Sequence, residues 1–245
     1  MQEPDLEAVL ALVERMEYTS SSFPAALIGL LVLAPPMMAQ GRLVDQGVFE
    51  ISRGSQIVGR EEFVLRTGRQ QSPGNGFTLT IQSYYPASSA RPVLVSVVEF
   101  GPDSLPTAAR LDVDTGDRPS VLVLFEPRRI TVRRVTPGAE SARQYPAAAR
   151  ALLSDEMLVC LYTILPSSEN GTVNLIDPRT GDKETLELTD MGRVRTLVAG
   201  TEMTLRHRSL GSNERARHLW YDAEDRLMKV EIISTGVVAI RTPGQ

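Results

Sequence analysis

The two histidines of the chain, His207 and His218, are the residues best suited to do chemistry. Both lie in a stretch where polar and apolar residues alternate, which is typical of β-strands. We predict two strands, 201–209 and 214–221, joined by a tight turn. In that hairpin His207 pairs with Ala216, and both imidazoles lie on the same face.

This predicted face is our candidate ligand-binding surface. It also carries the only tryptophan, and after a loop at 223–225 the next strand adds apolar side chains to it. Such a face can line a pocket in which imidazoles bind a polar group or titrate. The alternative is a pair of core histidines that hydrogen-bond to backbone or hydroxyl groups. The predicted ligand-binding residues are His207, His218, Trp220, Met203, Leu205, Met228 and Val230.

Neither a metal site nor a catalytic residue is predicted on this face, because in the predicted register it carries no carboxylate and no nucleophile. The sequence has no Gly-x-Ser-x-Gly, phosphate-loop, His-Glu-x-x-His or Cys-x-x-Cys motif. Its single cysteine, Cys160, lies in an apolar stretch and excludes both a disulfide framework and a cysteine-based zinc site. We therefore predict no cofactor, and the sequence favours a protein that is not an enzyme without deciding the question.

The composition is that of a globular protein, with 23% charged and 42% hydrophobic residues. The net charge of −4 argues against a nucleic-acid partner held by bulk electrostatics. The partner that fits best is a hydrophobic small molecule or a lipid. Protein partners are not predicted.

Residues 1–39 read as a leader with a signal-like apolar segment. The run from Ala25 to Ala34 is apolar, and it is too short to cross a bilayer as a helix, which takes ~20 residues. It matches the apolar core of a secretory signal, with cleavage expected after Ala39. We therefore predict a periplasmic or secreted protein without a membrane span in the mature chain. The flank before the run is acidic rather than basic, which leaves open a later start at Met16, an uncleaved anchor or a buried helix.

Residues 40–245 read as a single antiparallel β domain. Apolar and polar residues alternate over 77–82, 109–114 and 185–189, and turn residues punctuate the joins. One interval, at about 146–165, is predicted to be a helical insert, because Pro146 and the alanines after it suit a helix. The predicted fold is mainly β: a strongly curved antiparallel sheet, as a half-barrel or open barrel, around one or two short helices.

Two hairpin motifs carry a family resemblance. The first is Gly47-Val-Phe-Glu-Ile51 with Gly54, Gly59 and Glu62-Phe63; the second is Trp220-Tyr-Asp222 followed by Leu227-Met-Lys-Val-Glu231. In these motifs the sequence resembles exported bacterial families of unknown function, whose β-rich fold is similar to the lipoprotein-carrier half-barrel. The resemblance covers roughly residues 44–240. It implies a sheet curled around helices with an apolar concave side, and it brings no catalytic residues.

Three functions follow from these observations. The first is an exported, non-enzymatic binding or carrier protein for a hydrophobic ligand such as a lipid or an acyl chain, which predicts an apolar cavity near Trp220. The second is an envelope structural or protein-interaction module with a solid core. The third is a hydrolase that uses His207 or His218 together with an acid from elsewhere.

Overall fold

The computed structural model describes residues 41–67, 76–113, 120–136, 138–155, 157–165 and 170–242. The chain divides into two units, Met1–Met37 and Met38–Gln245, and all described residues belong to the second. The predicted leader and the cleavage point after Ala39 lie outside the described residues. Within the described ranges, no helix is long and apolar enough to cross a membrane.

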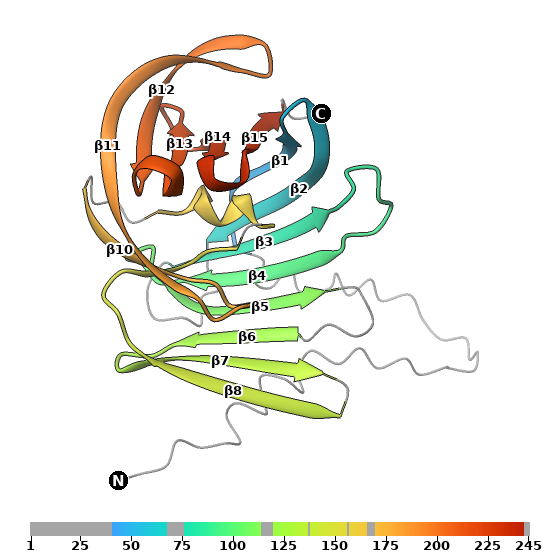
Figure 1. Ribbon diagram of the computed structural model, residues 1–245, viewed down its shortest axis with the longest axis vertical. Helices are drawn as coiled ribbons and strands as arrows, with labels where there is room; N and C mark the ends of the chain where they lie inside the picture. Colours follow the sequence, from blue (N-terminus) through green and yellow to red (C-terminus); the bar gives the residue numbers. More distant parts are fainter. Residues whose placement is uncertain are drawn as a thin grey trace, which may run out of the picture. The chain divides into compact units, whose positions relative to one another are not determined.

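The described strands form one sheet in the order β8-β7-β6-β5-β4-β3-β2-β1-β15-β14-β13-β12-β11-β10-β9 (Figure 1). Neighbouring strands are antiparallel except β9 and β10, which are parallel. The predicted mainly β class and the antiparallel sheet are thus confirmed. The strands are β1 (Leu43–Arg53), β2 (Gln56–Thr67), β3 (Phe77–Tyr84), β4 (Leu94–Phe100), β5 (Pro106–Val113), β6 (Ser120–Phe125), β7 (Arg129–Thr136), β8 (Ala139–Pro146), β9 (Ala151–Leu153), β10 (Gly171–Ile176), β11 (Lys183–Val198), β12 (Thr201–Leu210), β13 (Arg217–Tyr221), β14 (Leu227–Ile232) and β15 (Val237–Thr242).

β1 and β15, the first and last strands along the described chain, pair with each other near the middle of the sheet. β1 forms a hairpin with β2 on one side and pairs with β15 on the other, from Val48 opposite Thr242 to Arg53 opposite Val237. All other neighbours are consecutive in sequence. The β1–β15 pairing therefore joins β2–β8 to β9–β14.

Alternation along β2 shows how the strands build the core. Phe63 and Leu65 are buried, while Glu62, Val64 and Arg66 beside them are only partly buried. Successive side chains of a strand point to opposite faces, so every second residue reaches the same side. Glu61 has the same parity, and it is fully buried on the core side. The core face of the sheet thus carries a carboxylate.

The described residues of the interval 146–165 form one short 3-10 helix but no α-helix, so the predicted helical insert over the whole interval is not found. Its residues instead complete β8, form β9 and end in a short 3-10 turn, η1 (Val159–Thr163), and the described residues contain no α-helix. Helix propensity is a weak preference that tertiary contacts override. Here Ala151–Leu153 pairs with β10, and the amides of Val159 and Cys160 hydrogen-bond to Glu61 rather than within a helix.

Residues 157–165, which we call the strap, lie against the core face of the sheet. The Ser83 hydroxyl on β3 donates to the Met157 carbonyl at 3.3 Å, and the Tyr221 hydroxyl on β13 donates to the Tyr162 carbonyl at 2.7 Å. β3 and β13 are not neighbours in the sheet. Through these hydrogen bonds the strap, the yellow ribbon in Figure 1, connects separate parts of the same sheet.

Candidate functional site

The structure brings the two histidines and the tryptophan together, in a register different from the predicted one. His207 of β12 lies opposite Trp220 of β13, not Ala216, because the connection contains a 3-10 turn, η2 (Asn213–Arg215). The shift is an even number of residues, so His218 keeps the predicted face. The His207 Nε2 and His218 Nδ1 atoms are 2.9 Å apart, and the His207 ring stacks on Trp220 at 4.7 Å.

The third strand of this face differs more strongly from the prediction. A β-bulge between Trp220 and Tyr221 places Lys229 opposite Trp220 and Glu231 opposite His218. The prediction that Val230 joins this face is wrong, because Val230 is fully buried in the main core on the other side. A one-residue slip reverses the face of every later side chain in a strand.

The remaining predicted residues form a small second cluster. Leu205 and Trp220 are buried there together with Val198, and Met203 and Met228 pack against them. Val198 lies at the end of β11, and Figure 1 shows the β11–β12 hairpin arching over β13–β15. The predicted binding face is thus partly covered by its own hairpin.

Charged groups border this cluster. The Lys229 ammonium lies 4.7 Å from the centre of the Trp220 ring and forms an ion pair with Glu231 at 2.6 Å. Burial, followed by the neighbouring His218, lowers the pKa of His207. Among the described residues, no group of three or more His, Cys, Asp or Glu side chains could hold a metal ion. One imidazole donates a hydrogen bond to the other, which fixes both rings beside the tryptophan.

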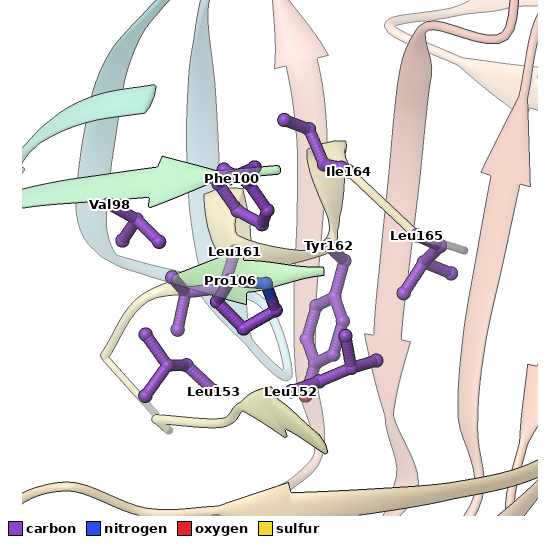
Figure 2. A pocket seen from close by; sticks show the side chains of 9 residues that line it. All are labelled: Val98, Phe100, Pro106, Leu152, Leu153, Leu161, Tyr162, Ile164 and Leu165. Atoms are coloured by element: carbon purple, nitrogen blue, oxygen red, sulfur yellow. The ribbon is translucent and has the colours of Figure 1, made fainter. Parts of the chain in front are cut away.

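In the described part of the chain, the cavity within the main core is too small for a ligand. A cavity of about 10 Å³ lies among apolar side chains of β4, β5, β9 and the strap, and Figure 2 shows these side chains converging on it. A cavity must offer ~10–15 Å³ to hold one water, so no acyl chain fits here. The lining residues are Val98, Phe100, Pro106, Leu152, Leu153, Leu161, Tyr162, Ile164 and Leu165.

A larger cleft, of about 300 Å³, opens beside the end of the strap. We call it the arginine cleft, because two arginines of β12 line it together with apolar residues of β1, β2, β3 and the strap. The complete lining is Val44, Leu65, Phe77, Ser104, Thr163, Ile164, Leu165, Arg206, Arg208, Tyr221, Glu224 and Asp225. Its volume lies at the lower end of the range of small-molecule sites, ~300–1,000 Å³.

Two polar side chains of the arginine cleft are almost fully buried. Arg208 is 6% exposed and Thr163 is 8% exposed. Burial lowers the pKa of the Arg208 guanidinium, because loss of water disfavours the charged form. Arg206 is held by Asp190 at 2.7 Å and lies 3.8 Å from Asp225.

Arg206 and Arg208 were not among the site residues predicted from the sequence. Both lie on the face of β12 opposite to His207, and that face reads as polar in sequence. The sequence nevertheless contained a signal that this face is buried. Leu210 lies on the same face of β12, and Leu219 and Tyr221 lie opposite the two arginines on β13. All three are buried in the main core.

A buried polar centre lies at the other end of the strap, around Glu61. Its carboxylate accepts hydrogen bonds from the Val159 and Cys160 amides at 3.0 and 2.9 Å, and the Tyr85 hydroxyl lies 3.5 Å away. Burial raises the pKa of Glu61 to about 7. Burial also raises the pKa of the Cys160 thiol, so this cysteine is held as an unreactive thiol.

No family model, curated protein or solved structure was found to match this chain.

Proposed function

We propose that this protein is an exported, non-enzymatic binding or carrier protein for a hydrophobic ligand such as a lipid or an acyl chain. The observation that supports this proposal is the arginine cleft of about 300 Å³, whose walls include Leu65, Phe77 and Ile164. Concave sites with apolar walls and a few polar groups are typical of small-molecule binding. The ligand lies in this cleft and not at the His207–Trp220 face.

The proposal includes a curled sheet. We propose that the sheet bends over the strap as a half-barrel, with the arginine cleft at one of its openings. Hydrogen bonds that Glu61 accepts from the strap, and that Ser83 and Tyr221 donate to it, support this curvature, because the three residues lie on strands that are not all neighbours in the sheet order. The contact between β5 and the edge strand β9 supports it as well.

The proposal also includes export to the periplasm or the medium, with removal of residues 1–39. The support is the uncharged, apolar character of the segment before Gln40. Expression of the full chain in a bacterium, followed by cell fractionation and N-terminal sequencing, tests it. If the protein is exported, we expect to find it outside the cytoplasm with Gln40 as its first residue. An intact chain retained in the cytoplasm would contradict export.

A pair of neighbouring substitutions tests the binding site. Val44 and Leu43 are 44% and 42% exposed at the start of β1, but only Val44 lines the arginine cleft. Val44→Trp places a large ring at the cleft, whereas Leu43→Trp makes a matched change outside its lining. We expect Val44→Trp to weaken binding of a fluorescent acyl probe by about tenfold or more, equivalent to about 1.4 kcal/mol, and Leu43→Trp to leave binding unchanged.

Native mass spectrometry provides an independent measurement. We expect lipid or fatty acid to be retained by the wild-type protein purified without detergent, and to be lost from Val44→Trp. The absence of bound lipid, together with no binding of the acyl probe at micromolar protein concentration, would refute the proposed function.

One observation favours a second candidate, a protein-interaction module. β8 is an edge strand of the described sheet, and seven of its eight residues are exposed. An open edge can accept a strand from another protein. If the protein is an interaction module, we expect no amphiphile to bind. We expect the wild-type protein to recover a stable partner from the native host, and Ala142→Pro to lose this partner because the substitution disrupts pairing along this edge.

A further inference from the structure

We infer that the ligand of the arginine cleft is an amphiphile with an anionic head, whose acidic group lies between Arg208 and Thr163 and whose aliphatic chain extends toward Phe77. This inference rests on the proposed binding function and specifies its ligand class. The shared chemistry is an acidic oxyanion on a hydrocarbon chain, which either a carboxylate or a phosphate can supply.

Positive charge is buried in the arginine cleft. Arg206 and Arg208 follow each other on one face of β12, and both line the cleft. Burial lowers the pKa of Arg208; Tyr221 and Asp190 oppose this shift, and the nearby Arg206 and Arg150 add to it. Guanidinium groups recognise carboxylates and phosphates through paired N–H donors. The two guanidinium groups that line the cleft are therefore suited to an oxyanion.

A buried hydroxyl of the arginine cleft, that of Thr163, lacks a hydrogen-bond partner in the described part of the chain. Thr163 is 8% exposed, and its Oγ1 atom has no hydrogen-bond partner among the described residues. Buried hydroxyls without a partner are rare in native proteins. The hydrogen bond between Tyr221 and the carbonyl of Tyr162, the residue before Thr163, holds this part of the strap beside β13. A ligand oxygen in the cleft can accept the Thr163 proton.

The arginine cleft has a charged wall on one side and an apolar wall on the other. The two arginines come from β12, whereas Val44, Leu65 and Phe77 come from β1, β2 and β3. β12 and β3 are separated in the sheet order. The charged and apolar walls are therefore contributed by different parts of the sheet. The acidic residues of the lining, Glu224 and Asp225, lie in the β13–β14 turn, and Glu224 forms an ion pair with Arg226.

Isothermal titration calorimetry of the full chain tests this inference with four ligands that share one chain length. The ligands are dodecanoate, dodecyl phosphate, dodecanol and dodecylammonium, the ionic ones below their critical micelle concentrations and dodecanol below its solubility limit. We expect at least one of the two acidic ligands to bind about tenfold or more tightly than dodecanol, and dodecylammonium to bind most weakly. The tighter of the two acids identifies the head group. Shortening the chain to decanoate removes two methylenes, and each is expected to contribute about fourfold to affinity.

Substitutions assign the head group to its partners. Arg208→Met keeps an unbranched, flexible side chain and removes the guanidinium charge, and Thr163→Val replaces the hydroxyl by a methyl group. We expect both to weaken binding of the acidic ligand while the affinity for dodecanol stays within about twofold. Arg195→Met, at an exposed position of β11, is the matched control and leaves all affinities unchanged. Circular dichroism checks that each variant folds, and Thr163→Val carries the test if Arg208→Met does not fold.

The outcomes separate this inference from the proposed function. Equal binding of dodecanoate, dodecyl phosphate and dodecanol, unchanged in Thr163→Val, would overturn the anionic head while leaving a hydrophobic binding protein. Tightest binding of dodecylammonium would also overturn it. Binding of none of the four ligands would refute the proposed function itself.

Discussion

Replacement of the buried Glu61 by glutamine provides a sharp test of the core structure. Glu61 is fully buried, and its two oxygens hold the amides of Val159 and Cys160. Glutamine keeps one acceptor oxygen, so one of the two amides loses its partner. Leaving a buried donor unsatisfied costs about 1–3 kcal/mol at any pH.

The pH dependence of this substitution follows from the pKa of Glu61. Burial raises this pKa from its usual 4.5 to about 7. Between these values the folded state holds a proton that the unfolded state releases, so the free energy of unfolding falls as the pH rises. One pKa unit corresponds to about 1.4 kcal/mol, so the wild type loses about 3 kcal/mol of stability by pH 8 through this group. Glu61→Gln carries no such penalty.

Urea unfolding of the full chain, followed by circular dichroism from pH 4.5 to 8.5, measures this effect. We expect Glu61→Gln to be less stable than the wild type at pH 4.5 and to gain about 3 kcal/mol relative to it by pH 8. Glu62→Gln makes the same chemical change at the next residue, where the side chain is partly exposed and pairs with Arg60. A stability difference for Glu61→Gln that stays constant with pH, or one that Glu62→Gln reproduces, would refute the reasoning.

Three further predictions concern packing and the histidine pair. Gly59→Ala places a methyl group where the Tyr85 ring lies, and we expect urea unfolding to show a loss of about 1–3 kcal/mol. Burial and the adjacent imidazole lower the pKa of His207, so NMR titration of its ring should show protonation below pH 6.5, and its contribution to stability is lost as the pH falls through that range. Leu219→Ala, at a fully buried position, should cost about 2–5 kcal/mol, whereas Leu197→Ala, at a 63% exposed position, should change stability by less than about 0.5 kcal/mol. Equal costs for the two alanines would contradict the core assignment.

The strands were the most predictable part of the fold. Alternation over Phe77–Ile81 and Ala109–Val113 matches β3 and β5, because the two-residue period of a half-buried strand is a local property of the sequence. The face shared by His207, His218 and Trp220 was predictable for the same reason. Their pairing was not, because the η2 turn and the β-bulge after Trp220 depend on how three strands meet.

The strap and the buried charges were beyond prediction from local pattern. Ala147–Leu153 has high helix propensity, but Ala151–Leu153 pairs with β10, which follows later in the chain. Burial of Glu61 depends on amides of the strap about 100 residues away. The same holds for Arg208, whose surroundings include Tyr221 and the end of the strap. From the sequence alone, a charged residue is expected to be exposed to solvent, because its buried partners are not visible there.

The pairing of β1 with β15 has a consequence for how the chain folds. Ser52 and Val238, which face each other across this pair, are 186 positions apart in the chain. Contacts between such distant residues slow folding. The ribosome releases β1 long before β15, so β1 exposes an unsatisfied edge for most of synthesis. A nascent chain that stops before Val237 leaves the edges of β1 and β14 open together, and we expect it to aggregate rather than to form a smaller native domain.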